Sequence, residues 1–178
     1  PDYIIIGEVR GEEAYTLFQA IATGHLGMCT LHAESVEAAL MRLQSPPMNI
    51  PRNMIAMLDT ILVQRRAERD GMPIRRTEVV AEIVGYDESR DQIELNVIYR
   101  WNPEEDSFSY LNKCLSLKDI ATRIGYSMDR IEEELGKRRM VIDWMCRTGR
   151  RSFAEVAEIV RRYVYDPESV LRYARIGV

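Results

Sequence analysis

The chain opens with a short apolar run, a helical pattern and a second short run. Tyr3 to Ile6 are all apolar, which is typical of a strand covered on both faces in a parallel sheet. After Gly11, apolar residues recur at helical spacing until Gly24 ends the pattern, and residues 27–32 predict a second strand. A strand, a helix and a strand of this length predict a right-handed crossover with both strands in one parallel sheet.

Two helices and an antiparallel module are predicted next. Ser35 is placed to cap a helix that Pro46 and Pro47 end, and Pro51 opens a second helix. Strands are then expected at residues 60–64 and 77–86, with Asp70-Gly71 in the turn between them, and residues 87–91 form the next reversal. The following strand alternates cleanly, so one face is predicted to be buried. The buried face carries Ile93, Leu95, Val97, Tyr99 and Trp101, and the wet face carries Gln92, Glu94, Asn96 and Arg100.

The last third of the chain predicts four helices. Gly125 ends the first, and Asp166-Pro167 starts the last. The expected apolar stripes of the two helices between them are Met128, Ile131, Leu135, Ile142 and Met145, and then Phe153, Val156, Val160 and Tyr163. We expect these stripes to pack together. The sequence therefore predicts an α/β domain with a β-hairpin module over residues 1–110 and a helical tail over residues 111–178.

Composition narrows the function classes. The 178 residues carry a net charge of -4 with a pI near 5.4, which argues against a dominant nucleic-acid or anionic-membrane surface. Cys29, Cys114 and Cys146 lie far apart without paired spacing, so a reduced, intracellular compartment is the simplest account. No apolar run approaches the length needed to cross a bilayer.

Candidate chemistry follows each of the first two strands. Glu8 comes just after the first strand, and His32 ends the second. Because ligands bind at the carboxyl ends of the strands in open α/β sheets, we expect Glu8 and His32 to meet at one edge. A carboxylate there is suited to orienting or deprotonating an attacking water, or to holding a magnesium shell. The alternative for Glu8 is a surface carboxylate that caps the next helix.

These residues resemble two motifs of the secretion-type hexameric ATPases, the superfamily of type II and type IV secretion motors, pilus motors and the archaellum motor. Ile4-Ile5-Ile6-Gly7-Glu8-Val9-Arg10-Gly11 looks like their Walker B, and Gly24-His25-Leu26-Gly27 with Thr30, His32 and Ala33 looks like their His box. Both motifs in order, at this separation, are specific, whereas either alone is weak. The helical tail resembles the archaeal branch, by motifs that are less specific.

The resemblance implies an ATP-hydrolysing site that uses ATP and Mg²⁺. Glu8 and His32 would be the catalytic residues, with Glu8 also holding Mg²⁺ through water and His32 approaching the terminal phosphate. Thr30 and His25 would support nucleotide binding, and Arg10 would pair with Glu8 or reach a phosphate in a neighbouring subunit. An ordinary ion pair is the alternative for Arg10, and a hydrogen-bonded structural histidine is the alternative for His25 and for His32.

The resemblance also implies a wider assembly. It predicts a RecA-like P-loop ATPase domain that forms a homohexamer in the cytoplasm, against a membrane platform protein, and drives protein secretion, pilus or archaellum assembly. The sequence contains no Gly-x-x-x-x-Gly-Lys-Ser/Thr loop, which cradles phosphates with backbone amides and a lysine. We therefore expect a carboxyl-terminal part of such an ATPase that does not hydrolyse ATP by itself.

Two alternative interpretations of the sequence are a metal site and a DNA-binding motif. A metal site of His25, Cys29, His32 and Glu34 is disfavoured, because alternation along a strand points Cys29 away from His32. Residues 117–127 with the helix after them resemble a helix-turn-helix that reads DNA. Acidic residues near the start of that helix would repel phosphates, namely Asp129, Glu132, Glu133 and Glu134.

Interaction surfaces are the remaining alternative. Residues 112–178 could act as a protein-interaction module. Arginines at positions 65, 66, 69, 75 and 76 straddle the first hairpin turn. A solvated hairpin tip is the default reading of these arginines, and contact with a neighbouring subunit or an acidic partner is the alternative.

Overall fold

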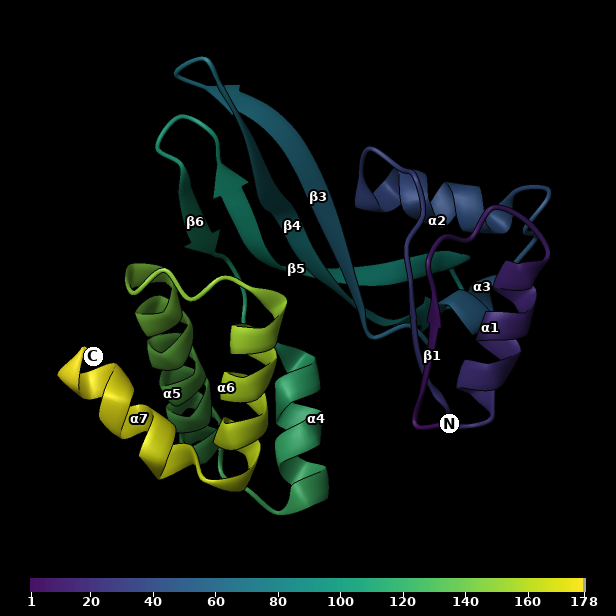
Figure 1. Ribbon diagram of the computed structural model, residues 1–178. Coiled ribbons are helices and arrows are strands. Elements are labelled where there is room, and N and C mark those ends of the chain that lie inside the picture. Colours follow the sequence, from purple (N-terminus) through teal and green to yellow (C-terminus); the bar gives the residue numbers. More distant parts are fainter. Residues whose placement is uncertain (178) are drawn as a thin grey trace. The chain divides into compact units, whose positions relative to one another are not determined.

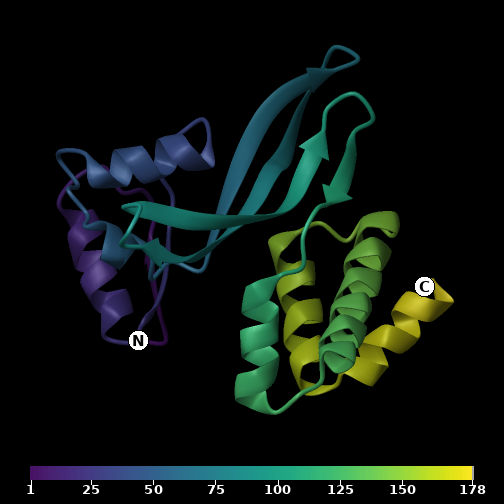
Figure 2. The ribbon, with the colours of Figure 1, turned by 180° about the vertical axis from the view of Figure 1, so that it is seen from behind.

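The computed structural model describes residues 1–177 and forms two compact units, Pro1–Ser116 and the part from Leu117 onward (Figures 1 and 2). The first unit contains β1 (Tyr3–Ile6), α1 (Glu13–Ala22), β2 (Leu26–Cys29), α2 (Val36–Gln44), α3 (Arg52–Ile55), β3 (Thr60–Arg69), β4 (Met72–Asp87), β5 (Gln92–Asn102) and β6 (Ser107–Tyr110). Helix α4 (Leu115–Ile124) begins there. The second unit also contains α5 (Met128–Arg147), α6 (Phe153–Tyr165) and α7 (Pro167–Ile176).

Strands β1 and β2 form a two-stranded parallel sheet, as the sequence predicts. Tyr3 pairs with Leu26 and Ile6 with Cys29, and α1 provides the crossover. The helix lies close against β2, because a Cβ atom at Gly27 would come within 2.8 Å of the Ile21 side chain. Only glycine allows this approach without displacing Ile21. The two strand ends that carry the candidate chemistry therefore lie side by side.

The expectation that both faces of β1 are covered is wrong for this sheet. Ile4 and Ile6 pack against the core, but Tyr3 and Ile5 are 54% and 71% exposed. The reason is that α1 covers one face and that the sheet contains two strands within the described residues. Strand β2 also stops earlier than predicted, at Cys29, because β1 ends at the paired residue Ile6.

The antiparallel module is a four-stranded sheet in the order β3-β4-β5-β6 (Figure 1). Asp70 and Gly71 both have positive φ and join β3 to β4, which suits the tight turn predicted there. Strands β3 and β4 extend further toward this turn than predicted, and β6 was not predicted. One face of the sheet carries Val63, Val79, Ala81 and Ile83 into a core shared with α1 and α2.

A β-bulge changes which residues of β5 face the core. Ala81 pairs with Val97 but Val80 pairs with Tyr99, so Ile98 is an extra residue in β5. Ile93, Leu95 and Val97 pack against the core as predicted, and Trp101 is also buried. The prediction is wrong for Tyr99, which is 42% exposed. Arg100, expected on the wet face, instead pairs with Val79 and shares its face.

The second unit has its own small core between α5 and α7. It consists of Val141, Trp144, Met145, Val170, Leu171 and Ala174, with α6 contributing Val156, Ile159 and Tyr163. The predicted stripes are wrong at Leu135, Ile142, Phe153 and Val160, which are 42%, 55%, 90% and 53% exposed. An ideal helix drifts from a seven-residue repeat, so the buried side of α5 moves onto Val141 and Trp144. No helix among residues 1–177 has the length and apolar character needed to span a membrane.

Glu82 is a buried carboxylate that organises the start of α4. Its side chain is 1% exposed and accepts hydrogen bonds from the backbone amides of Leu115 and Ser116, at 2.8 and 2.7 Å. The Cys114 thiol and the Asn96 side-chain amide also donate to it. Burial alone would raise the pKa of Glu82, but these hydrogen bonds outweigh burial and lower the pKa to about 2. The ionised carboxylate thus holds the helix start against β4.

Replacing this carboxylate should lower stability in a pH-dependent way. We expect Glu82→Gln to reduce the free energy of unfolding at neutral pH by roughly 2–4 kcal/mol, because a neutral amide cannot accept all four hydrogen bonds. The folded-state pKa lies below the ordinary value of 4.5, so the stabilisation is present above about pH 4.5 and is lost toward about pH 2. Urea unfolding between pH 3 and 7 measures this difference.

Glu94→Gln is the matched control, because Glu94 lies exposed on β5. This variant should have the same free energy of unfolding as the unchanged protein at pH 3 and at pH 7. A gap between Glu82→Gln and the unchanged protein that stayed constant down to pH 3 would contradict an ionised Glu82.

Candidate functional site

The candidate site forms where the chain leaves β1 and β2. Glu8 lies two residues past the end of β1, and His32 lies three residues past the end of β2. The two segments are tied by the amide of buried Val9, which donates to the Thr30 carbonyl at 2.9 Å. In the other direction, the Thr30 hydroxyl donates to the Gly7 carbonyl at 2.5 Å. These bonds extend the pairing of the strands into the loops.

Glu8 is the centre of the site. Its Oε1 atom lies 3.1 Å from Nε2 of His32, and its Oε2 atom accepts a hydrogen bond from Arg10 at 2.5 Å. The Glu8 side chain is 26% exposed, whereas His32 and Arg10 are 78% and 69% exposed. The predicted meeting of Glu8 and His32 at one edge is therefore confirmed.

The electrostatic setting keeps Glu8 ionised. The hydrogen bond from Arg10 lowers the pKa of Glu8, partial burial opposes it, and the charges of Arg10, His32 and Arg42 lower it further. Oε1 is buried, and among residues 1–177 its contact with His32 Nε2 at 3.1 Å lacks hydrogen-bond alignment. A buried anionic oxygen without an aligned donor has spare capacity to accept a hydrogen bond from water or to approach a cation.

Two supporting residues were not singled out by the sequence. Arg42 on α2 donates to the His32 carbonyl at 2.7 Å and so fixes the chain at that point. Glu13 on α1 accepts hydrogen bonds from the backbone amides of Arg10 and Gly11, at 2.5 and 2.9 Å, and these lower the pKa of Glu13. The only signal for Glu13 was an acidic residue in a first helical turn. Arg42 gave none, because its contact bridges ten positions.

His25 lies apart from these residues. It precedes Leu26 at the start of β2, whereas Glu8 and His32 follow the opposite ends of the paired strands. Its Nδ1 atom lies 3.3 Å from both the Thr23 hydroxyl and the Ala20 carbonyl. The structure thus brings together Glu8, Arg10, Thr30 and His32, and it does not bring His25 to them.

Cys29 belongs to the alternative metal site that the sequence suggests. It packs against the core, and burial raises the pKa of its thiol. Throughout residues 1–177 there is no group of three or more His, Cys, Asp or Glu side chains placed to hold a metal ion.

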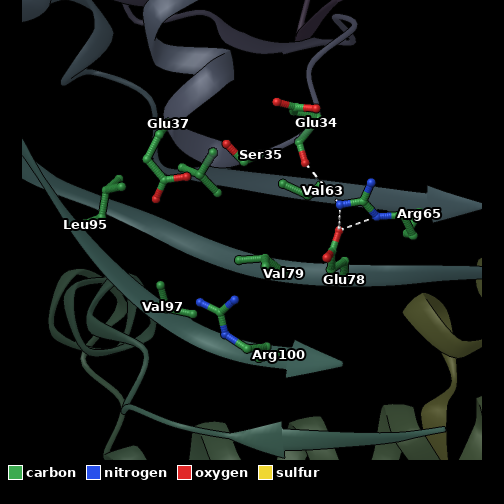
Figure 3. Close-up of a pocket in the computed structure, with 11 residues that line it drawn as sticks. Glu34, Ser35, Glu37, Val63, Arg65, Glu78, Val79, Leu95, Val97 and Arg100 are labelled. Atoms are coloured by element: carbon green, nitrogen blue, oxygen red, sulfur yellow. Dashed lines mark hydrogen bonds and ion pairs between the residues drawn. The ribbon is translucent and has the colours of Figure 1, made fainter. Parts of the chain in front are cut away.

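A small cavity of about 150 Å³ lies between the start of α2 and the sheet (Figure 3). Arg65 crosses one side of it and donates to the Glu78 carboxylate and the Glu34 carbonyl, while Arg100 extends from β5. Nucleotide-sized ligands need about 300 Å³ or more. A larger hollow, about 360 Å³, belongs to the second unit and is lined by side chains of α7 alone. Neither cavity contains Glu8 or His32.

The chain is similar to several known proteins. The sequence profile of the family described as "Type II/IV secretion system protein" matches residues 1–90. An uncharacterized protein of Methanocaldococcus jannaschii is 45% identical over 163 residues, which cover 92% of this chain and 60% of the relative. Type II secretion system protein E of Klebsiella pneumoniae is 39% identical over 69 residues, 36% of this chain and 14% of the relative.

A third relative is the type IV pilus assembly ATPase PilB of Thermus thermophilus, which is 32% identical over 96 residues, 52% of this chain and 11% of that protein. The chain thus spans less than two thirds of each of these relatives. The family match contains β1 to β4 completely and ends before β5. Because it extends over half of the sequence, this chain belongs to the type II/IV secretion system protein family, with relatives in both archaea and bacteria.

Proposed function

We propose that this chain is part of a motor ATPase in which Glu8 and His32 face the phosphates of ATP. The observation that carries the proposal is the 3.1 Å contact between Glu8 Oε1 and His32 Nε2 beyond the carboxyl ends of two parallel strands. That edge is where α/β sheets bind ligands. Membership of the type II/IV secretion system family, and similarity to a named pilus assembly ATPase, support the reaction class.

In this proposal Glu8 acts on the attacking water. Its carboxylate is ionised, and the contact of Oε1 with His32 Nε2 lacks hydrogen-bond alignment, so this oxygen can accept a proton or a hydrogen bond from water. The same orphaned oxygen fits a magnesium ion held through water. Magnesium, when bound, would neutralise charge on the transferred phosphoryl group. His32 is the exposed partner, and in this proposal its imidazole approaches a terminal phosphate.

Arg10 and Thr30 complete the proposed site. The Arg10 guanidinium is 69% exposed while it bonds Glu8, so it is available to a phosphate in a neighbouring subunit. Thr30 acts as a positioning residue through the Gly7 carbonyl, and Arg42 does so through the His32 carbonyl. A nucleotide role for His25 rests on the motif resemblance alone.

The wider assembly is also a proposal. Residues 1–110 would form part of a RecA-like domain and residues 111–178 a helical tail, in a ring of six subunits. The ring would work in the cytoplasm against a membrane platform protein during protein secretion, pilus assembly or archaellum assembly. Support comes from the family match and from the bacterial relatives, which are a type II secretion system protein and a type IV pilus assembly ATPase.

The isolated chain is expected to be inactive. Its sequence contains no phosphate loop, so the amides and lysine that cradle the phosphates are not supplied. Purified protein should release no phosphate from ATP above the rate of a no-enzyme blank, with or without magnesium. Magnesium-dependent turnover that disappears in Glu8→Gln would contradict this expectation.

The catalytic role of Glu8 can be tested in a longer form of the protein that supplies a phosphate loop. We expect Glu8→Gln to lower kcat by about 100-fold or more while ATP affinity changes less than about fivefold, because the amide cannot take a proton from water. Steady-state phosphate release and binding of a fluorescent ATP analogue measure the two quantities. Glu12→Gln is the matched control, since Glu12 is an exposed neighbour outside the Glu8 contacts. An equal loss in both variants would remove Glu8 from the reaction.

The positioning role of Thr30 can be tested without nucleotide. Thr30→Val removes the hydroxyl that bonds Gly7, and a lost hydrogen bond of roughly 1 kcal/mol should speed exchange of the Val9 amide by about fivefold. Hydrogen exchange followed by NMR measures this rate. Thr23→Val removes a comparable hydroxyl bond, to Ala20, beyond the opposite end of β2 and should leave Val9 unchanged. Equal exchange in both variants would exclude the positioning role.

A further inference from the structure

The arm formed by β3 and β4 places arginines opposite one another on both of its faces. Arg65 pairs with Arg76, and Arg66 pairs with Arg75. Because side chains alternate along a strand, the first pair occupies one face of the arm and the second pair the other. The arm extends away from α1 to α3 in Figures 1 and 2. Each face of the arm therefore carries one pair of opposed arginines.

The arginines of the first face are neutralised by carboxylates. Arg65 donates to Glu78 at 2.7 Å, and Arg76 donates through two nitrogens to both oxygens of Asp106, each at 2.7 Å. The bonds from Arg76, followed by one from Trp101, lower the pKa of Asp106 to about 2. The repulsion between Arg65 and Arg76 is thus offset within the chain.

The second face carries two arginines whose charges have no partner. Within the described residues neither the Arg66 nor the Arg75 guanidinium makes an ion pair or a hydrogen bond, and both residues are exposed. Gln64 and Thr77, the next pair along the face, bond to each other. Glu68 shares this face, and among residues 1–177 it forms no ion pair with either arginine. Like charges directly opposite across two strands are destabilising, so an anion that binds both arginines would relieve their repulsion.

A row of apolar and aromatic side chains crosses the same face of the sheet. It comprises Leu62, Val80, Tyr99 and Tyr110, which are cross-strand neighbours on β3, β4, β5 and β6. Leu62, Tyr99 and Tyr110 are 55%, 42% and 57% exposed, and the two tyrosine rings lie 5.1 Å apart. Leu62 lies four residues before Arg66 on the strand, a separation of about 13 Å.

We propose that Arg66 and Arg75 bind carboxylates of an acidic segment of a partner protein, whose apolar side chains lie on this row. Two guanidinium groups held across adjacent strands suit carboxylates, and tyrosine and arginine are the residues that dominate protein interfaces. The site is too local for nucleic acid or an anionic membrane, which need an extended positive field. Here Glu68 lies beside the pair and the chain carries a net charge of -4. This interaction surface is separate from the proposed nucleotide site.

Binding of a fluorescein-labelled peptide composed of glutamate and leucine tests the proposal. At low salt, we expect Arg66→Glu and Arg75→Glu each to weaken binding to the full chain by about tenfold, as lost charged hydrogen bonds would. Arg100→Glu is the matched control, because Arg100 also makes no ion pair within residues 1–177 and lies on the opposite face of the same sheet. It should change the dissociation constant less than twofold. Fluorescence anisotropy measures these constants.

The proposal would be overturned if the unchanged chain did not bind the peptide at low salt. It would also be overturned if Arg100→Glu weakened peptide binding as much as Arg66→Glu and Arg75→Glu do. Binding of duplex DNA or phosphatidylserine vesicles that depends on Arg75, without peptide binding, would also overturn it. Glu8→Gln should leave peptide binding unchanged, so failure here is distinct from failure of the nucleotide proposal.

Thermal unfolding gives an independent readout of the opposed charges. Arg75→Glu replaces repulsion with attraction toward Arg66, so Tm at low salt should rise by about 1–3 °C, and the gain should shrink as salt screens the charges. A lower Tm in this variant would show that the two arginines do not oppose each other. The charge repulsion on which the proposed carboxylate-binding site rests would then be absent.

Discussion

The parallel pairing of β1 with β2 is the constraint on which the candidate site depends. It aligns Ile6 with Cys29, and the bonds between Val9, Thr30 and Gly7 carry the alignment beyond the end of each strand. Glu8 and His32, which are 24 positions apart in the sequence, therefore lie 3.1 Å apart. Gly27, which pairs with Ile4 in the same sheet, lets α1 pack closely on β2, because a Cβ atom there would come within 2.8 Å of the Ile21 side chain.

Glu82 and Glu8, both in the first unit, show how the hydrogen bonds around a carboxylate distinguish a structural role from a chemical one. Glu82 is fully surrounded by donors from β5 and the start of α4, so nothing further can bind it. Glu8 is also ionised, but one oxygen is bonded by Arg10, and the other is buried beside His32 Nε2 without an aligned hydrogen bond. The contrast supports a reactive role for Glu8, because a buried anionic oxygen that lacks an aligned donor can still accept one.

Local patterns predicted the crossover because each of its parts is short-range. The apolar run of β1, the helical spacing of α1 and the glycine before β2 all act within a few residues. The missed features depend on distant partners instead. Arg42 reaches His32 only because α2 folds back, and the bulge at Ile98 is defined by the register with β4. Alternation along β5 could not foresee that bulge, so Tyr99 and Arg100 were assigned to the wrong faces.

The arginines of the β3–β4 arm also differ in whether a carboxylate of the chain pairs with them. Neighbouring positions in the sequence gave one undifferentiated basic cluster, and only the strand register divides it into a neutralised face and an unpaired face. Arg76 has a bidentate carboxylate partner in Asp106, whereas Arg75, one residue away, faces only another arginine. A chain with an excess of acidic residues has no general shortage of carboxylates. Glu68 lies on this face but forms no ion pair with Arg66 or Arg75 among residues 1–177, so a partner's carboxylate would remove the repulsion that the fold leaves there.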